Sequence, residues 1–391
     1  MPIDFSAGGP DYAKYALLPE GVRDELAPMA EFEADIINDL LHVFAGYGYD
    51  RVSPPVLEYE DSLLSGVGAT KSSQMFRLMD AATQRTMALR ADMTQQVARI
   101  AATRLQNEER PLRLSYAGQV LRTKGSEIRP TREFWQAGVE FLGVESIEAE
   151  AEVIQIAIES LTAVGVNNLT LDLTVAPLVP MLAAQLGLDE KNSDLVRSAL
   201  DSKDIAALNH LQQEARDIFE VILGAADEAQ SAISKLRALN LQGDAGALID
   251  HLCQLVSLLQ VRSADLSITV DPGESRGFEY KSGIGFAIFA RGVRGELGRG
   301  GRYKSEFFDG AVESATGFSF YLDSILRALP APKMPEKLFL PYDIDSSLAH
   351  SYRKMGWRTV QGLTDAAHPI DEARRLNCSH YYNGSDIVSC D

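Results

Sequence analysis

Two short segments of this chain alternate apolar and polar residues, and the long segment between them has a different period. In both, every second residue is apolar: Leu169, Leu171, Leu173 and Val175 in the first, and Leu266, Ile268 and Val270 in the second. A period of two buries one face of a strand. Between about 176 and 264 apolar residues recur every three or four positions, which is the period of a helix. We therefore expect a sheet whose two segments are separated by an all-helical insertion.

The region ahead of the first alternation predicts a helix followed by an extended segment. Apolar residues recur at helical spacing from 29 to 47, where glycines end the pattern. Residues 49–56 then contain Pro54 and Pro55. Proline fixes its own φ and disfavours helical geometry in the residue before it, so this stretch is expected to be extended.

Further strand patterns occur at residues 284–290 and around 317–322. Between them, Gly300 and Gly301 predict a glycine turn, which is too weak a signal for a phosphate-binding loop.

A proline-rich linker follows, and we expect the main domain, residues 1–330, to end there. Residues 331–391 have the order strand, helix, strand, helix and short strand. This order predicts a small α/β appendage at the C-terminus.

Bulk composition is that of a soluble globular protein. The chain has 391 residues, 46% of them hydrophobic, and no apolar run approaches the roughly 20 residues of a membrane span. The N-terminus lacks a basic region followed by an apolar core, so we predict no secretory signal. Neither the three cysteines nor the six histidines have metal-ligand spacing. We expect a cytoplasmic protein that binds no membrane, metal or cofactor.

Net charge argues against a nucleic-acid partner. The formal charge is −18, and an anionic surface repels the phosphate backbone. Nine arginines nevertheless fall between Arg85 and Arg132, so a local basic patch for an anionic small ligand remains compatible with the sequence.

Residues 118–143, GQVLRTKGSEIRPTREFWQAGVEFLG, resemble motif 2 of the class II aminoacyl-tRNA synthetases, and of histidyl-tRNA synthetase in particular. Residues 29–56 resemble motif 1, with Pro55 at the position that lies in the class II dimer interface. The resemblance implies an α+β fold, an antiparallel sheet flanked by helices with the helical insertion and the small C-terminal appendage. The synthetase has a larger anticodon-binding domain at that place, so anticodon recognition is not expected.

The resemblance also implies a set of histidine-binding residues. LRADMTQQ places Asp92 and Thr94 against the α-ammonium group, and motif 2 places Arg122 and Gln136 at the carboxylate end and Glu140 at the imidazole, with Gln136 and Glu140 on segments flanking a sheet turn. SRGFEYKSG resembles the family's histidine signature, and its matching positions are Arg276, Tyr280 and Lys281. These residue types supply the cations, carboxylates and neutral acceptors that free histidine requires.

Four departures from the family pattern concern catalysis and affinity. Lys124 replaces a glutamate that helps to hold ATP, Ser324 replaces the arginine that stacks on ATP, and Tyr321 replaces a glycine. Adenylation depends on positioned phosphates, so it should be lost. Lys281 replaces the second tyrosine of the histidine pocket, and a contact with Glu140 would compete with histidine.

This combination resembles the regulatory subunits of ATP phosphoribosyltransferase, which are synthetase relatives without tRNA charging. The resemblance implies a homodimer inside a hetero-oligomer with the short-form catalytic subunit of the first step of histidine biosynthesis. It also implies activation of that subunit and feedback by histidine as effector. Two alternatives remain: a working histidyl-tRNA synthetase, which Lys124, Ser324, the short tail and the acidic charge oppose, and a metabolite-sensing relative with another partner.

Overall fold

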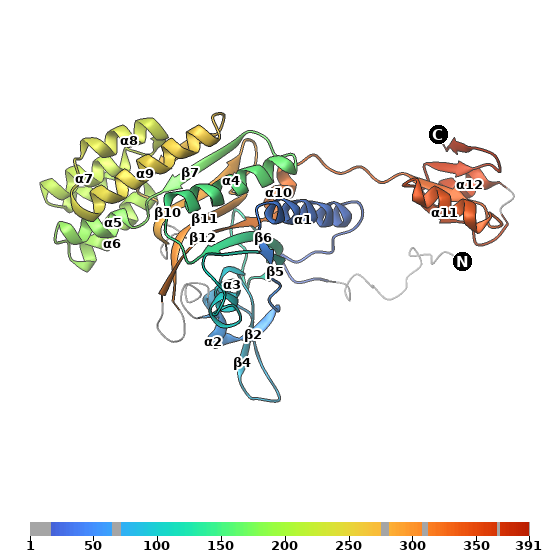
Figure 1. The fold of residues 1–391 in the computed structure, drawn as a ribbon, viewed down its shortest axis with the longest axis horizontal. Coiled ribbons are helices and arrows are strands. Elements are labelled where there is room, and N and C mark those ends of the chain that lie inside the picture. Colours follow the sequence, from blue (N-terminus) through green and yellow to red (C-terminus); the bar gives the residue numbers. More distant parts are fainter. Residues whose placement is uncertain (1–16, 65–71, 275–280, 307–311, 366–367, 391) are drawn as a thin grey trace. The chain divides into compact units, whose positions relative to one another are not determined.

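The computed structural model describes residues 17–64, 72–274, 281–306, 312–365 and 368–390. These residues form two compact units, one built mainly from residues 33–330 and the other from 331–391 together with 25–32 (Figure 1). Each unit has its own sheet and its own core.

The main sheet of the larger unit is mostly antiparallel. Its strand order is β1 (Asp50–Arg51), β5 (Leu112–Leu121), β6 (Glu133–Leu142), β12 (Val312–Tyr321), β11 (Gly298–Glu306), β10 (Lys281–Ala290), β7 (Leu169–Thr174), β9 (Ser267–Asp271) and β8 (Asp227–Glu228). The β1–β5 and β7–β9 pairs are parallel. Residues 118–143, which resemble motif 2, lie in the antiparallel β5–β6 pair, and the two alternating segments are β7 and β9.

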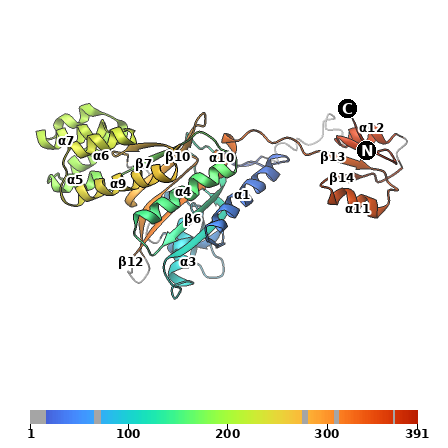
Figure 2. The same ribbon diagram turned by 45° about the horizontal axis from the view of Figure 1, so that its top comes forward.

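Helices α1 (Met29–Gly46) and α4 (Ile147–Ala163) cover one face of this sheet (Figure 2). Phe44 of α1 packs against Phe318 and Phe320 of β12, with ring centroids 5.8 and 6.4 Å apart. Because side chains alternate along a strand, the residues of β12 between these phenylalanines face the other side of the sheet. Helices α1 and α4 therefore do not cover that second face.

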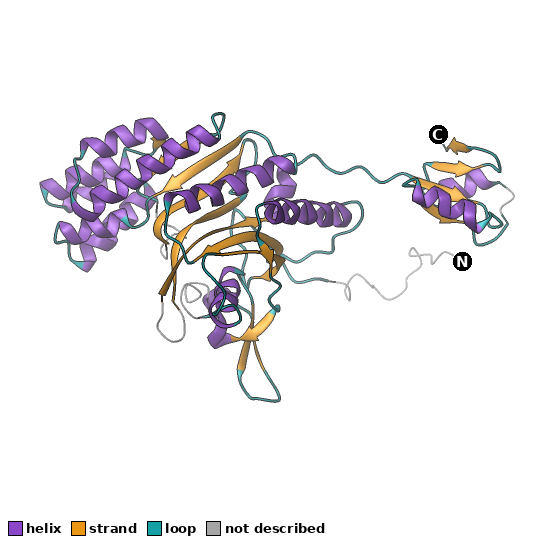
Figure 3. Ribbon diagram, in the orientation of Figure 1, coloured by secondary structure: helices purple, strands orange, loops and turns teal. Residues whose placement is uncertain are grey.

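The insertion between β7 and β9 is a helical layer (Figure 3). Its elements are α5 (Leu178–Gln185), α6 (Glu190–Ser202), a 3₁₀ helix (Ile205–His210), α7 (Gln213–Leu223), α8 (Ala229–Ala238) and α9 (Gly243–Arg262). The prediction of an all-helical insertion is wrong in one detail, because the two residues of β8 pair with β9. His251 of α9 meets the buried Glu150 of α4, with Nε2 and Oε2 2.5 Å apart, so the insertion is joined to the helix that covers the sheet.

The extended segment leads into a second, smaller sheet. It is formed by β2 (Leu57–Tyr59), β4 (Thr86–Leu89) and β3 (Arg77–Met79), with the short helix α2 (Glu60–Leu63) beside it. Helix α3 (Thr94–Thr103) follows and packs on the main sheet through Met93, Val97 and Ala101.

The predicted turn at Gly300 and Gly301 is wrong, since both residues lie within β11. A Cβ on Gly300 would lie 2.4 Å from the carbonyl oxygen of Gly317 and 2.4 Å from the Phe286 ring, and Gly301 has φ +132°. These glycines allow close packing between neighbouring strands, which a local turn signal does not distinguish. The stretch that contains Tyr321 and Ser324 is the end of β12 followed by helix α10 (Leu322–Ala328).

The smaller unit has the predicted order of elements. It contains β13 (Lys337–Leu340), α11 (Ser346–Lys354), β14 (Arg358–Gln361), α12 (Pro369–Arg375) and β15 (His380–Tyr382), and a further strand, β16 (Ile387–Ser389), that the sequence pattern did not predict. The sheet order is β14, β13, β15, β16. No helix in the described part of either unit combines the length and apolar character needed to cross a bilayer.

Candidate functional site

The open face of the main sheet is built from two rows of register partners. One row runs through Asp172, Ala287, Arg299, Ser319 and Gly138, on β7, β10, β11, β12 and β6. The next row, two residues along each strand, runs through Thr174, Gly285, Gly301, Gly317 and Glu140. Three adjacent glycines in the second row leave a hollow, because no side chain rises from them.

Four of the predicted residues meet at this hollow. Asp92 and Thr94, at the start of α3, line a cavity of about 30 Å³ together with Glu140 of β6 and Lys281 of β10. A Cβ on Gly317 would lie 2.0 Å from Oε2 of Glu140, so the glutamate occupies the space that this glycine provides. These residues come from three separate segments of the chain, all of which the sequence analysis had assigned to one site.

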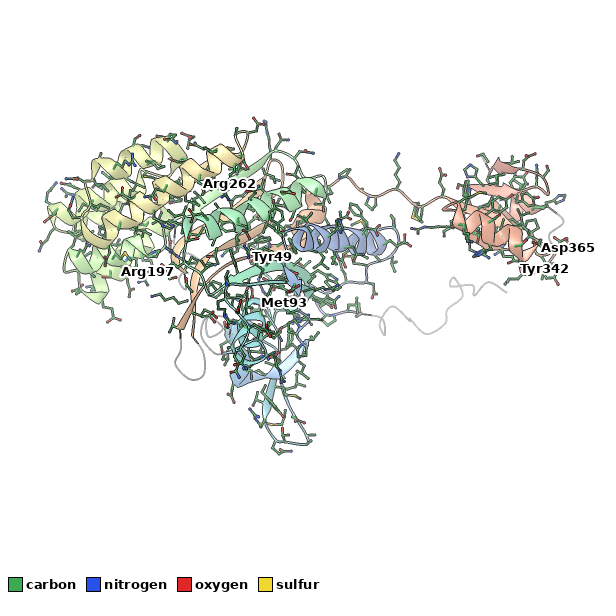
Figure 4. The ribbon with its side chains drawn as sticks, viewed as in Figure 1. Tyr49, Met93, Arg197, Arg262, Tyr342 and Asp365 are labelled. Atoms are coloured by element: carbon green, nitrogen blue, oxygen red, sulfur yellow. The ribbon has the colours of Figure 1, made fainter. Side chains whose placement is uncertain are left out.

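Gln136 holds the start of α3 in place. It is fully buried, its Oε1 accepts from the backbone N–H of Met93 at 2.8 Å, and its Nε2 donates to Oδ2 of Asp92 at 3.0 Å (Met93 is labelled in Figure 4). The other oxygen of Asp92 accepts from the backbone N–H of Thr94 at 2.9 Å. Gln136 and Glu140 do not flank a turn as expected, since both lie within β6 and face the same side.

Glu140 and Lys281 are buried charges that influence each other. The Tyr303 hydroxyl donates to Oε2 of Glu140 at 2.8 Å, and Nζ of Lys281 donates to the Gly301 carbonyl at 3.0 Å. Burial raises the pKa of Glu140 and lowers that of Lys281, while the opposite charge of each partner counteracts both shifts. The cavity thus contains a cation and an anion whose charged forms depend on one another.

Arg122 does not line this cavity. It lines a larger neighbouring cavity of about 430 Å³, where its guanidinium lies 5.0 Å from the Phe134 ring and its Nε donates to the Ala91 carbonyl at 3.3 Å. Arg299 and Tyr321 line both cavities. Sequence reasoning missed Arg299, because it lies directly before the glycines that were predicted to form a turn.

The positions that hold ATP in the family pattern have different residues in this chain. Ser324 is fully buried, and its hydroxyl accepts from Nη2 of Arg129 at 3.3 Å and from Nη2 of Arg327 at 2.9 Å. The Arg129 guanidinium lies 3.7 Å from the centroid of the Tyr321 ring. Lys124 is exposed. The protein's own arginine therefore stacks on an aromatic ring at a position where the predicted motif calls for a glycine.

The two remaining predicted residues, Arg276 and Tyr280, lie outside the described residues. Across the ranges that the structure covers, no group of three or more histidine, cysteine or acidic side chains has the arrangement needed to hold a metal ion.

Comparison with known proteins identifies the fold of the larger unit and its family. Residues 21–325 match the histidyl-tRNA synthetase family. Among solved structures, histidyl-tRNA synthetase from Nostoc superimposes with a TM-score of 0.75 at 16% identity, covering 94% of this chain and 90% of the other. The protein therefore has the class II histidyl-tRNA synthetase fold, and the predicted α+β class is confirmed.

Closer relatives identify the branch of that class. The ATP phosphoribosyltransferase regulatory subunit of Paramagnetospirillum magneticum is 47% identical over 376 residues, which is 96% of this chain and 98% of the relative. A Bacillus halodurans structure described as an ATP phosphoribosyltransferase regulatory subunit/histidyl-tRNA synthetase has a TM-score of 0.80 at 24% identity, over 92% of this chain and 96% of the other. The chain belongs to the ATP phosphoribosyltransferase regulatory subunit family, as the sequence predicted. It is a regulatory chain, and the synthetase alternative is not favoured.

Proposed function

We propose that this chain is the non-catalytic partner of a short-form ATP phosphoribosyltransferase subunit in the first step of histidine biosynthesis, in the cytoplasm. The catalytic subunit transfers ATP onto phosphoribosyl pyrophosphate. This chain raises the turnover of that subunit and carries feedback by histidine. Family membership supports the proposal.

One observation in the structure supports the proposal independently of family membership. The polar cavity retains two acids at fixed positions, Asp92 and Glu140, whereas the neighbouring positions that would hold ATP have Tyr321 and the buried Ser324. An amino acid needs acceptors for its ammonium group and its side chain, and ATP needs cations and a stacking surface. The arrangement favours recognition of an amino acid without its activation.

The proposed histidine contacts are those of the sequence prediction, refined by the geometry. Asp92 and Thr94 receive the ammonium group and Glu140 the imidazole, and Gln136 orients Asp92. Arg122, Arg276 and Tyr280 are the remaining contacts of the predicted set, and Lys281, its last member, borders the cavity beside Glu140. The 30 Å³ cavity has room for only one or two water molecules. Histidine entry therefore requires the side chains of Lys281 and Glu140 to move apart.

The hetero-oligomer is tested by mixing this chain with the short catalytic subunit. We expect co-elution at micromolar concentration in size-exclusion chromatography with light scattering, a higher turnover of the catalytic subunit, and a reduced rate when histidine is added. No co-elution and no change in rate would refute the assignment and leave a sensor with a different partner.

Loss of synthetase chemistry is tested by histidine-dependent exchange of pyrophosphate into ATP. We expect no exchange above that of an Arg122→Ala variant, because the ATP-holding glutamate and arginine are Lys124 and Ser324 here. Exchange above this blank would favour the synthetase alternative.

The proposed homodimer uses the motif 1 face. An open groove of about 740 Å³ runs beside the extended segment, lined by Pro54, Pro55, Leu57 and Ile100 among others. We expect Ile100→Glu to shift the chain toward the monomer in light scattering, because burying a carboxylate in an apolar interface costs its hydration. Val261→Glu, on an 83% exposed residue of α9, is the matched control and should leave the mass unchanged.

A further inference from the structure

Among the predicted site residues that the structure describes, none places a cation where the carboxylate of an amino acid would lie. The smaller cavity contains Asp92 and Glu140, which repel a carboxylate, and its ammonium group, Nζ of Lys281, donates to the Gly301 carbonyl. Gln136 is one of the two residues predicted for this role, but its amide accepts from the backbone N–H of Met93 and donates to Asp92. Arg122, the other, lines only the larger cavity.

Arg299 lies at the boundary between the two cavities. It is the β11 member of the row that also contains Ala287 and Ser319, and it lines both cavities. The alanine and the serine on either side are small, so they leave space above the sheet beside the guanidinium. Its side chain is 27% exposed and therefore accessible to a ligand.

Glu296 orients this arginine. Nε and Nη2 of Arg299 both donate to Oε2 of Glu296, at 2.9 and 2.7 Å. Both donors to Glu296 lie on one edge of the planar guanidinium group, and this contact fixes its orientation. The charge of Arg299 also contributes to the lowered pKa of Lys281, behind the larger effect of burial, so its field reaches the smaller cavity.

We propose that Arg299, positioned by Glu296, binds the α-carboxylate of the amino acid whose ammonium group meets Asp92 and whose side chain meets Glu140. This inference rests on the proposed function and replaces Arg122 in that role. A zwitterion then spans the boundary, with its anionic end at Arg299 and its cationic end at Asp92. Each end faces the opposite charge, which favours α-amino acids over amines that lack a carboxylate.

The test compares histidine with histidinol, which has a hydroxymethyl group in place of the carboxylate. Both are titrated calorimetrically into the full chain and into Arg299→Gln. Loss of one charge-assisted hydrogen bond corresponds to about tenfold or more in dissociation constant. We expect that loss for histidine and a change below about threefold for histidinol. Arg294→Gln, on an exposed arginine of the connection between β10 and β11, is the matched control and should leave both affinities within about threefold. Arg122→Gln is titrated as well, because Arg122 lines the larger cavity only.

The outcomes separate this inference from the proposed function. If the native chain binds histidine but Arg299→Gln binds it equally well, or weakens both ligands alike, the carboxylate contact lies elsewhere and only the inference fails. A selective loss in Arg122→Gln would return the role to Arg122. If the native chain binds no histidine, the feedback role and the inference fail together. Thermal unfolding checks that each variant folds. If Arg299→Gln does not fold, Arg299→Lys replaces it in the test. This variant keeps the charge but not the paired N–H donors of the guanidinium, and it should give an intermediate histidine affinity.

Discussion

Lys281 and Glu140 place opposite charges against one small cavity, and burial opposes the charged form of each. If the charges of Lys281 and Glu140 stabilise each other in the native chain, a ligand that contacts Glu140 must first displace the lysine. The tyrosine expected at position 281 from the family pattern carries no such charge.

Lys281→Tyr is therefore expected to tighten histidine binding. One competing charge-assisted hydrogen bond is worth about 1.5–3 kcal/mol, or roughly tenfold or more in dissociation constant. Glu140→Ala should weaken binding by a similar factor. Titration calorimetry on the chain without its partner measures both. Weaker binding by Lys281→Tyr would make the lysine a ligand contact in its own right.

The substitution Gly317→Ala tests how tightly the strand packs against the Glu140 side chain. Its Cβ would lie 2.0 Å from the Glu140 carboxylate and 2.5 Å from the Val139 carbonyl, so Gly317→Ala must displace backbone or a buried charge. We expect a loss of about 1–3 kcal/mol in the free energy of unfolding, measured with urea. Gly46→Ala is the control, because nothing lies within 4 Å of its Cβ, and it should change stability by less than about 1 kcal/mol. Equal effects of the two substitutions would contradict this packing.

Asp172 predicts a pH dependence of stability. Burial, followed by the nearby Asp271, raises its pKa, although the Thr269 hydroxyl donates to it at 2.5 Å. The folded state therefore binds the proton more tightly than the unfolded state. Its contribution to stability is present at pH values below the unfolded pKa and is lost as the pH rises through the raised folded pKa. Asp172→Asn should stabilise the protein at neutral pH more than at pH 3.5, as measured by urea unfolding. A gain that is independent of pH would exclude this origin.

At the scale of elements, α4 connects the sheet to the helical insertion. Its N-terminus is capped by Ser146, whose hydroxyl accepts from the backbone N–H of Ala149 at 3.1 Å. We expect Ser146→Ala to cost about 1 kcal/mol, since one helix donor loses its partner. Ser146→Asp keeps an acceptor and should retain most of the stability. If the two variants unfold at the same urea concentration, the cap contributes nothing.

The periodicity of apolar residues predicted helices and strands well where only one face of the element is buried. Helix α1 and strand β7 each bury one face, so the pattern is visible in the sequence. Strand β11 buries glycines, an arginine and a tyrosine against both neighbours, and this composition has no strand signature. The two-residue β8 is formed only because β9 lies beside it.

At the scale of the whole molecule, we propose that residues 1–330 and 331–391 are separate domains. The cores of the smaller unit draw only on residues within it, such as Phe339, Leu340, Ala349 and Cys378. The linker contains Pro330, Pro332, Pro335 and the exposed Lys333.

Limited trypsin digestion should therefore cut first at Lys333. The expected products are one large and one small fragment that both resist further cleavage, because the rest of each core is packed. Mass spectrometry of the early products identifies the site, and Lys333→Gln is the control that should slow this cut. First cleavage inside either proposed domain would contradict the boundary.

The sequence by itself determined the fold class and the family, and it supplied most residues of the proposed site. These depend on local order, such as the alternation of apolar and polar residues along β7 and the motif that contains Gln136 and Glu140. Such spacings place side chains on one face whatever surrounds the strand.

The tertiary structure decided which of those residues share a cavity. Insertion of β11 between β10 and β12 places Arg299 beside the acids, while Arg122 faces a separate cavity and Gln136 turns to Asp92. The physical reason is that strands from distant parts of the chain pair in the sheet, as β12 pairs with β6, which carries Glu140. Their order sets which charges meet, and spacing along the sequence does not contain that order.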